Sequence, residues 1–87
     1  MRQEDERMVR YKYTVVVERD EDGMYIASAP AIQGCYTQGE TYKEAMKNIR
    51  DAIKLHIDAR KKLGEQIPIE QAIEEVEIVA KATPSKA

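Results

Sequence analysis

Two side chains in this sequence have the chemistry of a nucleophile and its base: Cys35, the only cysteine, and His56, the only histidine. A catalytic cysteine needs a base within hydrogen-bond reach and surroundings that lower the pKa of its thiol. Cys35 lies just before a polar turn, whereas His56 lies in a segment of helical periodicity, at the border of its apolar face. We therefore interpret Cys35 as a small buried strand residue and His56 as a boundary residue of a helix, and we predict no catalytic residue.

Acidic side chains gather in one short stretch, at Glu18, Asp20, Glu21 and Asp22. Carboxylates can coordinate a divalent cation, but this run does not fit the Asp-rich spacing of a calcium loop. The sequence has no C-x-x-C, H-x-x-x-H or H-E-x-x-H pattern, so His56 lacks co-ligands at a compatible spacing. We predict no metal and no cofactor. Two interpretations of the acidic run stay open: a solvated turn, or a contact for a basic protein partner.

Alternating apolar and polar residues predict the strands that position this acidic run. The alternation from 9 to 17 is typical of a strand with one buried face. The pair Asp22-Gly23 is a hairpin signal, because glycine accepts the positive φ of tight turns. Residues 24–29 should therefore return antiparallel to the first strand. We predict a third, short strand around residues 33–37, after Pro30 ends the second one.

A long helix is predicted after the third strand. Thr41 and Glu44 form a capping box, which places the start of the helix near Tyr42. Gly64 can adopt the left-handed cap, so the helix should end near Leu63. Apolar residues recur at spacings of three and four and predict a face that packs on the sheet: Ala45, Ile49, Ala52, Ile53 and Ile57.

The segment after the helix is ambiguous. Residues 69–74 can form a turn or two of helix, whereas residues 75–80 alternate like a strand. We predict a short fourth strand there, joined through the helix by a right-handed crossover. The predicted fold is α+β, with a three-stranded antiparallel meander, one long amphipathic helix and a short fourth strand in the order β-β-β-α-β. It forms one domain, residues 8–81, and the polar tails at 1–7 and 82–87 should be frayed.

Composition restricts the class of protein. Sixteen acidic against 14 basic residues give the 87-residue chain a net charge of −2, so no global basic field draws it onto nucleic acid. No run approaches the roughly 20 apolar residues of a membrane helix. A single cysteine cannot form an internal disulfide, which suits a reducing compartment. We therefore expect a soluble cytoplasmic protein with no membrane contact.

The order of these motifs resembles the HicB-like antitoxin family over residues 9–69. The family pattern runs through an acidic D-G hairpin, a Tyr-Ala-x-x-Pro strand end, a G-C-x-T-x-G-x-T turn and an E-A-x-x-N-x-x-x-A-I helix. The matching positions are Asp22, Gly23, Tyr25, Ala27, Pro30, Gly34, Cys35, Thr37, Gly39, Thr41, Glu44, Ala45, Asn48, Ala52 and Ile53. This resemblance implies a fold similar to part of the ribonuclease H fold. It also implies an antitoxin that obstructs HicA, a small basic ribonuclease, generally as a dimer or higher oligomer.

Three functions follow as alternatives. The leading one is a homo-oligomeric antitoxin, a dimer or tetramer, that binds and neutralises a HicA-type toxin, with Glu18 and the acids at 20–22 as its contact. Many family members continue into a DNA-binding domain, for which this chain has no room, so direct DNA binding is not expected. The second is an orphan oligomeric structural or ligand-binding module without a toxin, with residues 75–80 as an edge or exchanged strand. A nuclease ranks third, because Glu18 and Asp51 are not clustered as two-metal hydrolysis requires.

Overall fold

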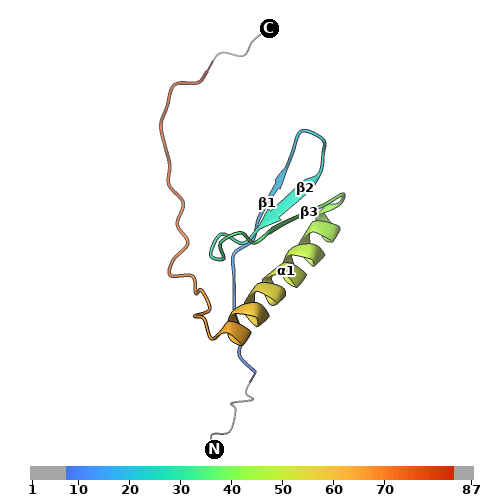
Figure 1. Ribbon diagram of the computed structural model, residues 1–87. Helices are drawn as coiled ribbons and strands as arrows, with labels where there is room; N and C mark the ends of the chain where they lie inside the picture. The colour runs from blue at the N-terminus through green and yellow to red at the C-terminus, as the bar shows by residue number, and fades with distance from the viewer. Residues whose placement is uncertain (1–7, 84–87) are drawn as a thin grey trace, which may run out of the picture.

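The computed structural model describes residues 8–83, and in it one long helix packs on one side of a three-stranded antiparallel sheet (Figure 1). Residues 1–7 of the first expected tail and residues 84–87 of the second lie outside the described residues. The strand order is β1-β2-β3, so β2 is central. The elements are β1 Val16–Arg19, β2 Tyr25–Ser28, β3 Tyr36–Gly39 and α1 Tyr42–Leu63. The predicted α+β succession of three strands and a helix is confirmed.

The hairpin between β1 and β2 is closed at the predicted Asp-Gly pair. Gly23 has φ 83°, and its amide donates to the Asp20 carbonyl at 3.0 Å. The Asp20 carboxylate also accepts hydrogen bonds from the backbone amides of Asp22 and Met24, both at 2.9 Å. Asp20 therefore shapes this turn with its side chain as well as with its backbone.

The first predicted strand is wrong in its extent, although its buried face is right. Ladder pairing covers only Val16↔Ser28 to Arg19↔Tyr25, whereas a strand was predicted over 9–17. Beyond Ser28 the second strand gives way to a tight loop, so residues 9–15 have no ladder partner among the described residues. A strand needs such a partner to exist. The alternation still holds, because Val15 and Val17 are half-buried and Val16 is exposed.

The third strand begins three residues later and ends two residues later than predicted. It spans Tyr36–Gly39, whereas residues 33–37 were expected. Gly34 has φ 78°, and the Cys35 amide donates to the Ile32 carbonyl at 3.1 Å, so residues 32–35 form a turn. Positive φ at Gly34 is incompatible with a regular strand at that position.

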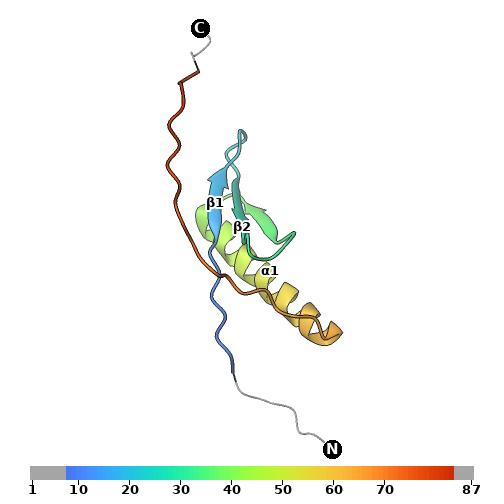
Figure 2. The same cartoon turned by 90° about the vertical axis from the view of Figure 1, so that its left-hand side faces the viewer.

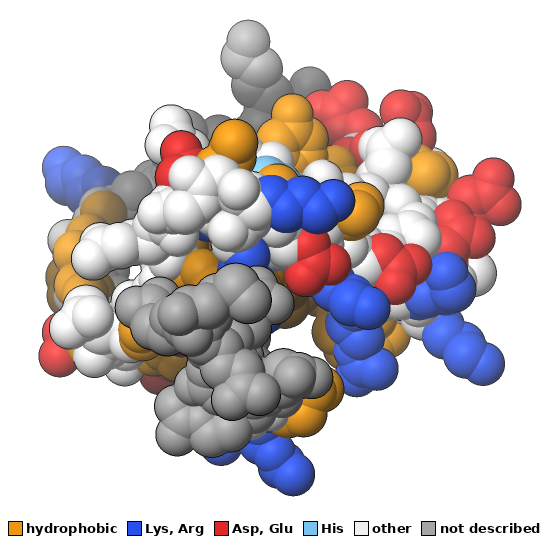
Figure 3. Space-filling model, turned by 60° about the horizontal axis from the view of Figure 1, so that its bottom comes forward, with side chains coloured by type: hydrophobic (Ala, Val, Ile, Leu, Met, Phe, Trp, Pro, Cys, Tyr) orange, Lys and Arg blue, Asp and Glu red, His pale blue; other side chains and the backbone are white. Residues whose placement is uncertain are grey.

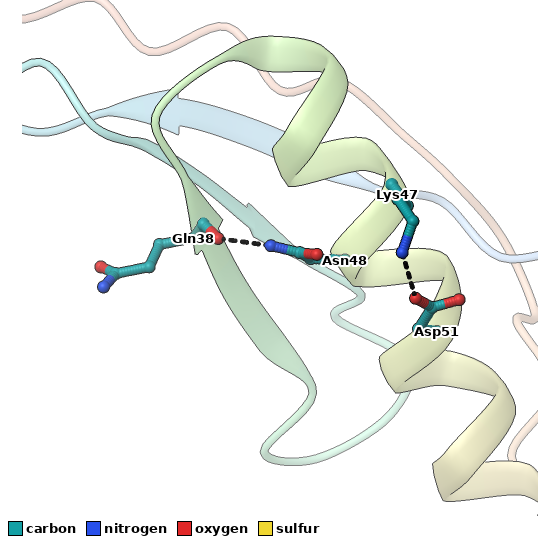
Figure 4. Close-up of polar contacts among 4 residues, drawn as sticks. All are labelled: Gln38, Lys47, Asn48 and Asp51. Atoms are coloured by element: carbon teal, nitrogen blue, oxygen red, sulfur yellow. Dashed lines mark hydrogen bonds and ion pairs between the residues drawn. The ribbon is translucent and has the colours of Figure 1, made fainter.

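Helix α1 lies across β2 and β3, and β1 stays outside its cover. Side chains at this interface are small because the two layers approach closely. Gly39 is buried, and a Cβ added there would lie 2.6 Å from the backbone nitrogen of Ala45. The helix also contacts the sheet through Asn48, whose Nδ2 donates to the Gln38 carbonyl at 2.9 Å (Figure 4). The buried core consists of Ala27, Ala29, Ile32, Cys35, Ala45 and Ile49.

Both ends of α1 are where the sequence predicts them. Thr41 Oγ1 accepts from the Glu44 amide at 3.0 Å, and the Glu44 carboxylate reaches back to the Glu40 amide at 3.0 Å. Gly64 adopts φ 71° and its amide donates to Lys61 O at 3.2 Å. These caps satisfy backbone groups that the helix itself leaves without partners.

Replacing the helix cap should have a moderate effect. Thr41→Ala removes the acceptor for the Glu44 amide, and we expect the free energy of unfolding to fall by about 1 kcal/mol. Thr41→Ser keeps a hydroxyl at the same position and should cost far less. Urea unfolding followed by circular dichroism measures both. Equal losses for the two variants would show that the hydroxyl is not the stabilising group.

The fourth strand predicted at 75–80 is wrong for the single chain. No helix or strand is assigned after α1 within the described residues, so residues 69–74 are not helical either. After the helix the chain crosses the segment that precedes β1. At this crossing Tyr13 OH donates to the Pro68 carbonyl at 2.5 Å, and the Glu70 carboxylate accepts from the Thr14 amide and hydroxyl. Residues 71–80, called the arm below, are all exposed and have no strand partner among the described residues.

Candidate partner-binding surface

The acidic run occupies the end of the β1–β2 hairpin. Glu18 lies on β1, and all four of its carboxylate residues are exposed. The structure separates them by role, because the Asp20 carboxylate is engaged by two backbone amides of the turn. Glu18, Glu21 and Asp22 are the members whose side chains face solvent without such a role. The acidic contact predicted from the sequence stays a prediction, and Asp20 is the member of the run whose carboxylate also shapes the turn.

Arg19, in the middle of the run, does not cover these carboxylates. Its guanidinium lies over the Tyr25 ring, 4.9 Å from the ring centroid, and its Nη2 donates to the Gly23 carbonyl at 3.4 Å. A cation–π contact of this kind holds the side chain against β2. The hairpin end consequently presents negative charge that suits a basic protein surface.

The described residues contain no group of three His, Cys, Asp or Glu side chains that could hold a metal ion. Asp51, the second acid considered for hydrolysis, is exposed on α1 and pairs with Lys47 Nζ at 3.1 Å (Figure 4). Glu18 lies on β1, a strand that makes no contact with α1. The structure does not bring these two carboxylates together.

Cys35 and His56 have Arg60 as a common neighbour. The Cys35 side chain is buried, 3% exposed. Burial raises the pKa of its thiol, and the nearby Arg60 guanidinium lowers the pKa by a smaller amount. His56 contacts Arg60, with Nδ1 3.2 Å from Nη1. Arg60 is thus the neighbour that sequence reasoning missed, because nothing local to Cys35 points to a residue so far along the chain.

The Cys35 thiol should be unreactive in the folded chain. A raised pKa means less thiolate at any given pH, and only the thiolate reacts with iodoacetamide. Burial adds the requirement that the core opens first. We expect alkylation at neutral pH to be on the order of 100-fold slower than for the urea-unfolded chain, as for an opening free energy of about 3 kcal/mol. Rapid alkylation without urea would contradict this interpretation and reopen a chemical role for the thiol.

Two grooves lie beside the point where the chain after α1 crosses the segment that precedes β1. One is lined by residues 9–13 and 68–70, and the other by Thr14, Pro30, Ala31 and residues 69–74. Pockets for small ligands are concave and combine an apolar lining with convergent polar groups. These grooves are instead open channels beside chain segments that lack strand partners. We interpret them as surfaces where further chain could pack.

The outer edge of β1 is open. The Asp20 amide donates to the Met24 carbonyl at 2.9 Å, and hydrogen-bonded pairs alternate along an antiparallel ladder. The backbone groups of Val17 and Arg19 therefore point away from β2. No other strand of the described chain lies next to them. An edge of this kind is a ready template for another chain.

The outer edge of β3 is partly covered. The Ala29 amide donates to the Cys35 carbonyl at 3.0 Å, so the same alternation turns the backbone groups of Tyr36 and Gln38 outward. The Asn48 side chain of α1 donates a hydrogen bond to the Gln38 carbonyl, so that acceptor is already used. Sequence reasoning noted Asn48 only as a motif position. The sequence did contain a signal for this role. Asn48 lies two turns into a helix that directly follows a short strand, so its side chain can reach that strand.

Charge on the lower face of the molecule is mixed. Lys and Arg side chains lie beside Asp and Glu side chains, with hydrophobic side chains between them (Figure 3). Nucleic-acid surfaces concentrate one sign of charge in a patch or stripe. The part of this face that is coloured has no patch or stripe of one sign. In the part of the chain that the structure describes, no helix has the length and apolar character to cross a membrane.

Comparisons with known proteins agree with this description. A family model, described as the HicB-like antitoxin of bacterial toxin-antitoxin system, matches residues 13–83. A UPF0150 protein of Thermoplasma acidophilum is 51% identical over 63 residues, 72% of this chain and 91% of the relative. A UPF0150 protein of Synechocystis is 41% identical over 63 residues, 72% of this chain and 80% of the relative. The crystal structure of the N-terminal domain of Burkholderia pseudomallei antitoxin HicB matches with TM-score 0.61 and 32% identity, over 68% of this chain and 69% of that chain.

Proposed function

The chain belongs to the HicB-like antitoxin family, and on this premise we propose that it binds and neutralises a small HicA-type ribonuclease toxin by occluding its active surface. In this proposal the chain acts by binding and not by catalysis, in the cytoplasm where such a toxin would cleave RNA. It contacts the toxin and not DNA. Family membership over nearly the whole described chain is the observation that carries the proposal.

The acidic hairpin end supports a basic partner. Glu21 and Asp22 lie in the hairpin turn and Glu18 lies on β1 beside it, all three exposed. The Arg19 guanidinium lies over the Tyr25 ring and donates to the Gly23 carbonyl. Complementary charge mainly speeds encounter, because opposite potentials steer two proteins together before they dock. We propose this tip as the part of the surface that the toxin meets first.

The first experiment tests the toxin itself. The tagged chain is purified from its native lysate, and each small basic polypeptide recovered with it is expressed alone and together with the chain. We expect one of these polypeptides to arrest translation by itself and to be silenced by co-expression. If none arrests translation, the antitoxin function fails for this chain, and an orphan oligomeric module becomes the better description.

A second experiment tests the contact. Glu21→Lys with Asp22→Lys leaves Asp20 and its turn intact, and we expect the association rate with the toxin to fall about ten-fold at low salt. The matched control is Glu40→Lys with Asp58→Lys, the same charge change at exposed positions of the chain. Equal association rates and equal salt dependence for the two variants would remove the hairpin end from the interface while leaving the antitoxin function standing.

A further inference from the structure

Two segments of this chain have strand patterns but no strand partner. Residues 9–15 carry apolar side chains at odd positions and the bases Arg10 and Lys12 at even positions. In the arm, residues 75–80 alternate in a similar way, with the acids Glu75 and Glu77 beside the apolar Val76 and Ile78. Neither segment pairs with another strand within residues 8–83. Their patterns are complementary, since one is basic and the other acidic on the polar face.

The arm is not packed on its own sheet. Val76 and Ile78 are each 76% exposed and Val79 is 90% exposed. The Cα radius of gyration is 17.7 Å, whereas a compact chain of this length would have about 12 Å. Contiguous exposed apolar side chains mark surfaces that another molecule covers. The arm therefore has the character of a segment that packs on a partner.

The crossing prevents the arm from pairing with the first segment of its own chain. Thr14 and Glu70 are hydrogen-bonded there, and Figures 1 and 2 show the two segments leaving this point in opposite directions. At about 3.3 Å per residue, the five residues from Thr14 to Val9 and the six from Glu70 to Val76 carry the two segments up to about 36 Å apart. The two complementary patterns can meet only if they come from different copies.

We propose that two copies of this chain exchange arms, with residues 71–80 of each copy adding as a strand beside residues 9–15 of the other. The exchange is two-fold symmetric, so both contacts form at once in a closed dimer. Each added strand continues toward the open edge of β1, satisfies backbone groups there and covers the half-buried face of Val15 and Val17. Arg10 and Lys12 of one copy then face Glu75 and Glu77 of the other. This inference concerns self-association and stands independently of the proposed toxin.

Charge reversal on the full-length chain tests the exchange. Arg10→Glu with Lys12→Glu makes the first segment acidic, and Glu75→Lys with Glu77→Lys makes the arm basic. Each variant alone sets like charges opposite each other in both contacts. We expect the dimer dissociation constant, measured by analytical ultracentrifugation, to rise about ten-fold or more in each.

Mixing the two variants distinguishes exchange from pairing within one chain. In the mixed dimer the acidic first segment of one variant faces the basic arm of the other, and the second contact keeps its natural charges. We therefore expect a mixed dimer about as stable as the natural one, recovered with two different affinity tags. An arm that pairs with β1 of its own chain gives no such rescue, and that result would overturn the proposal.

Matched controls separate this effect from net charge. Lys54→Glu with Lys62→Glu and Glu40→Lys with Asp58→Lys make the same charge changes at exposed positions away from both segments. Each control alone should keep the dissociation constant of the natural dimer. The proposal also fails if the natural chain is monomeric, or if the control pairs weaken and rescue the dimer as strongly as the test pairs do.

Discussion

Ile49→Ala should lower the free energy of unfolding by about 3 to 4 kcal/mol, the largest loss that we expect from any single core position. Ile49 is fully buried, 0% exposed, in a core of six small or medium side chains. Truncation leaves a cavity between α1 and the sheet that helix and strands can fill only in part. A domain of this size has roughly 5 kcal/mol or slightly more in total, so the variant should be partly unfolded at room temperature.

Leu55→Ala is the matched control, because Leu55 lies on the same helix and is 69% exposed. Its loss should stay within about 0.5 kcal/mol. Urea unfolding of both variants, at one protein concentration because the chain self-associates in our proposal, measures the difference. Similar losses at positions 49 and 55 would contradict the placement of α1 on the sheet.

The helix could be predicted to its ends because its signals are local. Thr41, Glu44 and Gly64 act within a turn of the positions that they cap, so neighbouring residues determine the bounds. The Asp22-Gly23 turn was predictable for the same reason. The role of Asp20 also had a local signal, since an aspartate two residues before another turn residue commonly accepts backbone amides.

The strands were predicted less well because a strand depends on a partner that the local pattern does not identify. Residues 9–15 and 75–80 alternate correctly, yet in the single chain neither finds a ladder. The two errors have one physical cause if the missing partner is a second copy. The third strand was displaced because Gly34 takes positive φ in a turn, which a glycine permits but does not require.

For the candidate surface, residue types were predictable and neighbours were not. The acidic run is evident from the sequence, but its division into the turn-forming Asp20 and three outward carboxylates depends on the folded hairpin. The Arg60 charge that lowers the pKa of the Cys35 thiol comes from a residue far along the chain. Only the packing of α1 over the sheet brings them together.

Gly39→Ala should be the most damaging change at a glycine, although Gly39 does not have positive φ. An added Cβ would lie 2.6 Å from Ala45 N and 3.0 Å from both Ala45 Cα and Glu44 C. These are backbone atoms in the first turn of α1, so no side-chain rotation relieves the contact. The helix start must move away from β3, which also strains the Thr41 cap and the Asn48 contact to Gln38. We expect a loss of about 3 kcal/mol in the free energy of unfolding.

Gly34→Ala separates this steric effect from backbone strain. Gly34 has φ 78°, but an added Cβ meets no atom within 4 Å, so the cost should be about 1 to 2 kcal/mol from the left-handed conformation alone. Urea unfolding of the two variants then compares the loss of stability caused by steric overlap at position 39 with the loss caused by backbone strain at position 34. A loss at position 34 equal to or greater than that at position 39 would mean that α1 can shift off β3 at little cost. The small residues that line this interface argue for the opposite, because they hold the two layers too close for even one methyl group.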